Sequence, residues 1–175
     1  MLISCIIIYQ FIVLYLIYLH IKFLKMTHLK TGDKAPLICT ETFDNKSFTL
    51  ETLKGKKIVL YFYPKDNTPG CTAQACNLNE NLEYLQKQGY EVVGVSPDSA
   101  SSHQKFIEKY GLKFTLLLDE DKKIANDYGV WGEKKNYGKV YFGIHRTTFI
   151  INEDGIIENI IEKVDTKNHT AQIVK

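Results

Sequence analysis

The chain has 175 residues, of which 45% are hydrophobic and 24% charged. This length is typical of one domain with a full hydrophobic core, and the composition excludes a disordered chain. The formal net charge is only +2, and the excess comes from two lysines near the N-terminus, so the rest of the chain gives no electrostatic reason to expect nucleic-acid binding.

An apolar segment occupies residues 1–25. Its core, residues 2–19, is just long enough to cross a bilayer as a helix. No basic region precedes it and no small-residue cleavage site follows it, so a signal peptide is not expected. The segment lacks Gly, Ala, Pro, Asp, Glu and Arg, as translated AT-rich upstream DNA would. We expect either a start codon placed too early, with the true start at Met26, or a membrane anchor. In both cases the domain at residues 26–175 faces the cytoplasm.

Strand and helix patterns alternate along residues 26–175. Turn residues within 43–50 predict an N-terminal hairpin, and the apolar run 57–63 predicts a buried central strand. A helix that starts near Cys71 presents apolar residues on one face and ends at Gly89. The later pattern predicts strands at 91–96 and 114–118, helices at 99–110 and 120–128, and a hairpin of 147–151 with 156–161. Such alternation indicates an α/β fold with a single domain.

The four cysteines lie in different contexts. Cys5 falls in the apolar segment and Cys39 near the first expected strand, and we expect no chemistry from either. Cys71 opens a helix, where free backbone N–H groups and the helix dipole favour a thiolate. Cys76 follows five residues later and could trap an oxidised Cys71. The spacing does not suggest a secreted disulfide framework and is a weak zinc signal, so we expect a redox-active nucleophile without metal or cofactor.

Arg146 is the single arginine in a chain that otherwise uses lysine as its basic residue. A guanidinium offers a planar fork of donors that an ammonium cannot imitate, so this arginine is a candidate for a chemical requirement. The alternative is an ordinary surface arginine.

The segment from Tyr61 to Cys76, YFYPKDNTPGCTAQAC, resembles the active-site signature of peroxiredoxins. Its second cysteine resembles that of the atypical two-cysteine branch named for the bacterioferritin comigratory protein. Residues 129–149 resemble the long loop and following strand of the same subfamily. From about Met26 onward the resemblance is close to continuous. It implies a thioredoxin-like fold with the peroxiredoxin N-terminal hairpin and extra helices, which periodicity alone would not have identified.

The resemblance also implies a role for each residue of the signature. Cys71 would attack a hydroperoxide and become a sulfenic acid. Thr68 would orient the thiolate and the peroxide, Pro64 would shape and shield the pocket, and Arg146 would stabilise the thiolate and bind the peroxide oxygens. Simpler interpretations remain open for two of them: Thr68 as a helix cap and Pro64 as a strand terminator.

Cys76 is the expected resolving cysteine. On an intact helix, residues five apart have Cα atoms about 8.7 Å from each other, whereas disulfides rarely span more than about 7 Å. A Cys71–Cys76 disulfide therefore requires the first turns of the helix to unwind. The alternatives are that Cys76 is an ordinary buried thiol or that a partner chain supplies the resolving thiol.

Two groups of residues near the signature have no expected catalytic role. Trp131, Tyr137 and Tyr141 are expected to pack in the long loop near the pocket. His103 and His145 are expected to be surface or packing residues. Arg146 is expected on a strand beside the pocket, and His145, its neighbour on that strand, should point to the opposite face.

We therefore expect a thiol peroxidase that reduces hydrogen peroxide and small organic hydroperoxides, is regenerated by thioredoxin and is a monomer. The competing hypotheses are a peroxide sensor or holdase in which Cys71 oxidation is a signal, a disulfide oxidoreductase, and a structural metal site. A disulfide oxidoreductase usually needs two cysteines separated by two residues, which this chain lacks.

Overall fold

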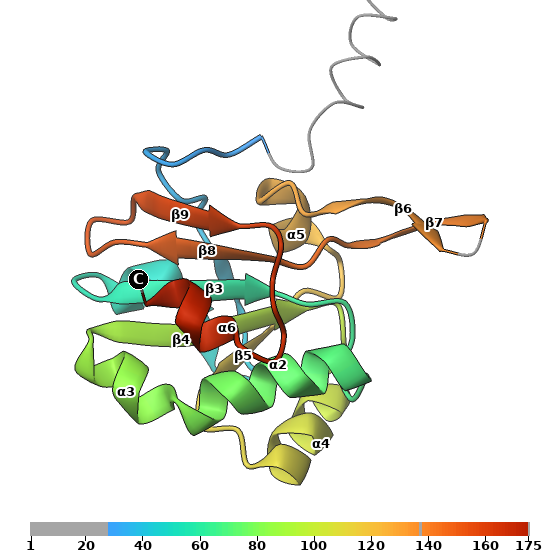
Figure 1. Ribbon diagram of the computed structural model, residues 1–175, viewed down its shortest axis with the longest axis horizontal. Helices are drawn as coiled ribbons and strands as arrows, with labels where there is room; N and C mark the ends of the chain where they lie inside the picture. The colour runs from blue at the N-terminus through green and yellow to red at the C-terminus, as the bar shows by residue number, and fades with distance from the viewer. Residues whose placement is uncertain (1–27, 137, 175) are drawn as a thin grey trace, which may run out of the picture.

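A five-stranded sheet forms the centre of the computed structural model, which describes residues 28–136 and 138–174 (Figure 1). The strand order is β5-β4-β3-β8-β9. The strands are β3 (Lys57–Phe62), β4 (Tyr90–Ser96), β5 (Thr115–Leu118), β8 (Thr147–Ile151) and β9 (Ile157–Ile161). β3, β4 and β5 run parallel, whereas β8 is antiparallel to both β3 and β9.

The expectations for residues 1–25, for the start at Met26 and for Tyr137 lie outside the described residues. Within the described part of the chain, no helix is long and apolar enough to span a membrane.

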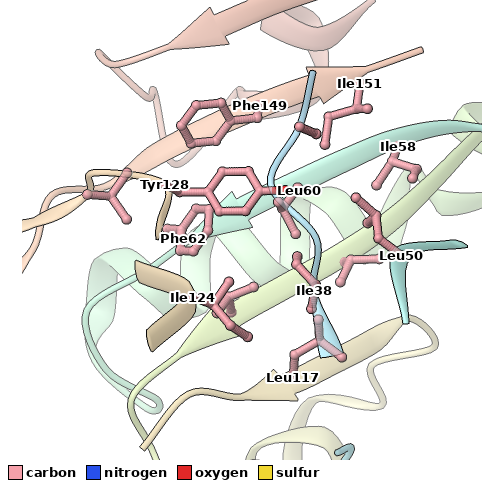
Figure 2. Close-up of a cluster of buried hydrophobic side chains, with 14 of the residues drawn as sticks. Ile38, Leu50, Ile58, Leu60, Phe62, Leu117, Ile124, Tyr128, Phe149 and Ile151 are labelled. Atoms are coloured by element: carbon pink, nitrogen blue, oxygen red, sulfur yellow. The ribbon is translucent and has the colours of Figure 1, made fainter. Parts of the chain in front are cut away.

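The central strand β3 supplies side chains to both faces of the sheet, because successive residues of a strand point to opposite sides. Its even-numbered residues Ile58, Leu60 and Phe62 belong to one core cluster, and Val59 and Tyr61 belong to the other. Figure 2 shows the first cluster, in which these three side chains lie with Tyr128 and Phe149. All but the first residue of β3 are buried, as the continuous apolar run predicted.

Helices cover the second face of the sheet. They are α2 (Pro69–Glu80), α3 (Leu82–Lys87), α4 (Ala100–Tyr110) and the C-terminal α6 (His169–Ile173). The first face is covered by the hairpin β1 (Cys39–Glu41) and β2 (Ser47–Thr49), the 3₁₀ helix η1 (Leu50–Leu53) and α5 (Lys123–Asp127). The single-domain α/β prediction is confirmed, as is the N-terminal hairpin.

The single helix expected from Cys71 to Gly89 is interrupted, and this prediction was wrong in part. α2 ends at Glu80 and α3 begins at Leu82, with Asn81 between them at φ −102° and ψ 10°. The side chain of Asn81 donates to the carbonyl of Asn77 at 2.8 Å, and such local side-chain bonds compete with a regular helix. The apolar face was predicted correctly, since Leu82 and Leu85 are both buried.

The long loop expected before Arg146 is instead a two-stranded hairpin. β6 (Trp131–Asn136) pairs with β7 (Lys139–Ile144) in antiparallel register. The turn includes Gly138 at φ +79°, a conformation that favours glycine. Figure 1 shows the hairpin extending beyond the sheet at the end where β3 finishes.

Candidate active site

Cys71 lies in the first turn of α2, at the end of the molecule where β3 finishes. Thr68 is the N-cap residue of this helix and Pro69 occupies its first position, where a missing N–H costs nothing. The Cys71 side chain is buried, with 2% of the residue exposed. A buried thiol at a helix N-terminus meets unpaired backbone N–H groups, which favour negative charge on sulfur.

Arg146 contacts Cys71 although 75 positions separate them in the sequence. Its Nη2 donates to the Cys71 Sγ at 3.1 Å. The contact arises because β8 runs antiparallel to β3 and pairs Thr147 with Phe62, so the residue before β8 lies beside the loop that follows β3. Arg146 itself falls between β7 and β8, not on a strand as expected. A guanidinium at this distance stabilises a thiolate by charge and by hydrogen bonding.

Gln74 is a further residue of the site that the sequence reading missed. It is fully buried one turn after Cys71, and its Oε1 accepts a hydrogen bond from Arg146 Nη1. Residues three apart lie on the same face of a helix. The sequence signal was therefore that Gln74, a polar residue, shares the apolar face of α2 with Cys71, Ala75 and Leu78. Arg146 is thus held by two partners on α2.

His169 continues this contact chain and was also missed. Its Nδ1 lies 3.2 Å from Gln74 Nε2, and its Nε2 lies 3.1 Å from the Thr148 hydroxyl. Burial, and secondly the charge of Arg146, lower the pKa of His169 to about 4 against the opposing effect of Asp165. No sequence signal links these residues, because 95 positions separate His169 from Gln74.

Thr68 and Pro64 lie where the signature predicted, in and before the loop that leads into α2. The Thr68 carbonyl accepts from Thr72 N at 2.8 Å, but its side chain makes no capping bond. Its hydroxyl instead donates to the Lys65 carbonyl at 3.0 Å, which leaves oxygen lone pairs available as acceptors. Pro64 is half-buried after Tyr63, whose N–H donates to Val95 O and continues the pairing of β3 with β4.

A buried contact between Asp66 and His103 anchors the loop between β3 and α2. The Asp66 carboxylate accepts hydrogen bonds from Tyr63, Ser102 and His103, each at 2.8 Å. Burial opposes the ionised form, but the bonds and charge of His103, together with Ser102 and Tyr63, lower the pKa of Asp66 below its usual value. The other ring nitrogen of His103 lies 3.1 Å from the Leu117 carbonyl, so both ring nitrogens lie against oxygen atoms. His103, expected to be a surface or packing residue, is fully buried.

Cys76 lies in α2 as well, half-buried, and both Cys71 and Cys76 are free thiols. Burial, and secondly the charge of Glu80, raise the pKa of Cys76. Both effects favour the neutral thiol as long as the helix is intact. Cys39 is exposed on β1, in the layer that covers the opposite face of the sheet.

The hairpin β6–β7 contributes packing and polar contacts near Arg146. Trp131 was expected to pack in a loop near the pocket, but it lies on β6 and packs against the first core cluster. Tyr141 is exposed, so its expected packing was wrong. Lys134 donates to the Ile144 carbonyl at 2.9 Å, and burial, then the charge of Arg146, lower its pKa. His145 contacts the Glu133 carbonyl at 3.2 Å through Nε2, and it lies outside any strand, so the alternation argument does not apply to it.

Among residues 28–136 and 138–174, no three His, Cys, Asp or Glu side chains gather as a metal site would require.

Comparison with known proteins identifies close relatives. The family description AhpC/TSA matches residues 31–160. A putative peroxiredoxin bcp from Coxiella burnetii is 46% identical over 146 residues, which are 83% of this chain and 97% of that protein. Peroxiredoxin Bcp of Escherichia coli K12 is 45% identical over 144 residues, 82% of this chain and 92% of its own.

A solved structure gives the same answer for the fold. The bacterioferritin comigratory protein of Xanthomonas campestris, studied for its alkyl peroxide reduction activity, superposes with a TM-score of 0.74. The two are 32% identical, and the match covers 84% of this chain and 94% of that one. The expected thioredoxin-like peroxiredoxin fold is confirmed.

Proposed function

Because this chain belongs to the AhpC/TSA family, whose members matched above are peroxiredoxins, we propose that Cys71 is the peroxidatic nucleophile of a thiol peroxidase. One observation carries the assignment: a buried thiol at a helix N-terminus accepts a hydrogen bond from the only arginine in the chain. This pairing supplies both a thiolate and a cationic donor for the charge that develops on the leaving oxygen.

The first step is a displacement at oxygen. The Cys71 thiolate attacks the terminal oxygen of a hydroperoxide, an S–O bond forms, the O–O bond breaks, and the leaving alkoxide or hydroxide takes up a proton. The products are a sulfenic acid and an alcohol or water. Arg146 donates to the peroxide oxygens, and the free lone pairs of Thr68 accept the hydrogen of the hydroperoxide. Pro64 closes one side of the pocket.

The second step regenerates the enzyme. The Cys76 thiol displaces hydroxide from the Cys71 sulfenic acid, which releases water and forms the Cys71–Cys76 disulfide. We expect local unwinding of α2 to precede this step, because burial raises the pKa of Cys76 in the intact helix and helix geometry keeps the two cysteines too far apart for a disulfide. A thiol reductant then cleaves the disulfide, and thioredoxin is the reductant that we propose.

The substrates that we propose are hydrogen peroxide and small organic hydroperoxides. The reported alkyl peroxide reduction of the Xanthomonas relative supports the organic class. We further infer a cytoplasmic monomer, because every group in the two steps comes from one chain and a thioredoxin-linked cycle suits a reducing compartment.

The test is peroxide-dependent oxidation of NADPH with thioredoxin and thioredoxin reductase. Cys71→Ser should abolish turnover, and Cys76→Ser should form a sulfenic acid trapped by dimedone without cycling. Cys39→Ser is the matched control, because it removes an exposed thiol outside the site, and it should retain full turnover.

Two results would overturn the proposal in different ways. Fast oxidation of Cys71 without turnover would mean another reductant or a signalling role. No reaction of Cys71 with peroxide would remove the peroxidase assignment of the residue itself.

A further inference from the structure

A buried chain of side chains runs from Cys71 to the C-terminal helix. It passes from Arg146 to Gln74, from Gln74 to His169 and from His169 to Thr148. Gln74, His169 and Thr148 are each 0% exposed. The proposed peroxidase steps assign no task to these three residues.

Because Arg146 can only donate hydrogen bonds, it determines how Gln74 is oriented and which nitrogen of His169 carries the proton. A guanidinium only donates, so the atom of Gln74 that faces Arg146 is the carbonyl oxygen. The amide NH₂ of Gln74 therefore faces His169 and donates to its Nδ1. Since Nδ1 accepts, the proton of a neutral His169 is on Nε2, from where it is donated to the Thr148 hydroxyl oxygen.

We propose that His169 is a positioning residue for the peroxidase reaction, which holds Gln74 and, through it, the Arg146 guanidinium against Cys71. This inference rests on the proposed function of Cys71. It requires the neutral imidazole, since only an unprotonated Nδ1 can accept from the Gln74 amide. A proton on Nδ1 would place a second donor against the Gln74 NH₂ group. The Gln74 amide would then favour a flip that turns its NH₂ group toward Arg146.

The surroundings of His169 keep the ring neutral. Tyr61 of β3 packs edge-on at 6.5 Å between ring centroids and brings no charge. Arg146 disfavours a second positive charge, and Asp165, before α6, is the opposing group. Burial and Arg146 lower the pKa to about 4, so the acceptor at Nδ1 persists throughout the neutral range.

Two substitutions at position 169 test the role in the full-length protein. His169→Leu removes the Nδ1 acceptor of the Gln74 amide. We expect the second-order rate constant of Cys71 oxidation by hydrogen peroxide to fall about tenfold, the usual effect of losing one hydrogen bond. The pH midpoint of Cys71 alkylation by iodoacetamide should rise by about one unit, because Arg146 is no longer held on the sulfur. His169→Asn keeps an acceptor near Nδ1 and should restore most of both values. His28→Gln changes an exposed histidine and is the control.

The alkylation midpoint distinguishes positioning from general stability, since a variant that is merely less stable but folded keeps its thiolate. A folded His169→Leu protein with an unchanged midpoint and an unchanged rate would overturn the inference. If His169→Leu does not fold by circular dichroism, Thr148→Val provides the second variant, because it removes the hydroxyl that accepts from His169 Nε2–H. It should shift both readouts in the same direction by a smaller amount, and no shift would overturn the inference.

Failure of the proposed function would have a different signature. If the unmutated protein did not react with peroxide, the alkylation midpoint would still report whether His169 supports the Cys71 thiolate.

Discussion

Arg146 donates from two nitrogens in two directions, one to Cys71 and one to Gln74. A lysine carries its donors on a single nitrogen and cannot hold this fork geometry. We expect Arg146→Lys to slow the oxidation of Cys71 by hydrogen peroxide about 100-fold, the usual scale for loss of one preorganised donor. Stopped-flow single-turnover measurements would give the rate, with Lys139→Arg on the exposed face of β7 as the control. A rate within threefold of the unmutated protein would show that charge alone is sufficient.

His169 also makes stability depend on pH. Its pKa is about 4 in the folded chain and 6.5 as the ordinary value, so between these limits the unfolded state binds more protons. The free energy of unfolding therefore falls as the pH falls through this window, by about 3 kcal/mol at most. Below it, protonation of Asp66, whose folded pKa is lowered, removes further stability.

Urea unfolding at pH 7, 5.5 and 4.5 would measure this slope. His169→Asn should flatten it between pH 6.5 and 4, whereas His28→Gln should leave it unchanged. An equal slope in the unmutated and the His169→Asn proteins would contradict the assignment of this proton.

Tyr61 of β3 and Tyr63, the residue after that strand, provide a matched test of buried hydroxyl groups. They stack at 5.3 Å between ring centroids, and both are 1% exposed. The Tyr61 hydroxyl has no hydrogen-bond partner in the described part of the chain, whereas that of Tyr63 donates to Asp66 at 2.8 Å.

We expect opposite effects from removing them. Tyr61→Phe should raise the free energy of unfolding by up to about 1 kcal/mol, because it removes an unpaired buried polar group. Tyr63→Phe should lower it by about 1–3 kcal/mol, because it leaves a charged acceptor with one bond fewer. Denaturant unfolding of both variants at pH 7 measures the difference, and destabilisation by Tyr61→Phe would mean that its hydroxyl has a partner in solution.

At the scale of elements, α6 restrains α2, the helix that must open. The Asn77 side chain accepts from Thr170 N at 2.9 Å and from the Thr170 hydroxyl at 3.0 Å, and it donates to the Lys167 carbonyl at 3.1 Å. Gln74 adds its contact with His169. Unwinding that brings Cys71 and Cys76 together must disturb these bonds.

Asn77→Ala should therefore accelerate disulfide formation. Loss of about 1–2 kcal/mol of restraint raises the open population roughly tenfold. The measurement is the rate at which the Cys71 sulfenic acid converts to a disulfide after one equivalent of peroxide. Asn79→Ala is the control, since this asparagine of the same helix bonds to Gly111 and Lys113 beyond α4. Equal acceleration by both variants would mean that general helix stability, not the tie to α6, sets the rate.

The burial of each element decided whether the sequence could predict it. β3 was found because an unbroken apolar run on a strand reports burial on both faces. The hairpin β6–β7 was missed because its strands leave the core: Val140 and Phe142 are 55% and 64% exposed, and polar residues alternate with no buried face to define a period. Asn81 broke the helix through a side-chain bond that no apolar pattern reports.

The residues of the site differ in the same way in how far the sequence could predict them. Pro64, Thr68 and Cys71 lie close together in the sequence, so a spaced signature could predict them together. Gln74 and His169 meet only because α6 returns to pack on α2. Contacts over such separations depend on the whole fold, and composition or periodicity cannot predict them.

At the scale of the whole molecule, the contacts of the site that the structure describes run from Tyr61 to Thr170. The matched part of this chain accounts for 97% of the Coxiella relative but only 83% of the chain itself. Among the described residues, the core clusters likewise begin at Leu29. The peroxidase chemistry is therefore expected to belong to the body of the chain, not to residues 1–25.

We expect a protein that starts at Met26 to keep the rate of Cys71 oxidation within about twofold and the midpoint of thermal unfolding within about 2 °C, since the described residues of the site and of the core all follow Met26. Both proteins would be purified in the same mild detergent and compared by stopped flow and by circular dichroism. A control deletion that starts at Ile38 removes Leu29 and Ala35 from the core and should be destabilised, because it exposes buried apolar surface. A tenfold slower rate in the protein that starts at Met26 would assign residues 1–25 a part in the folded domain and would exclude a merely misplaced start.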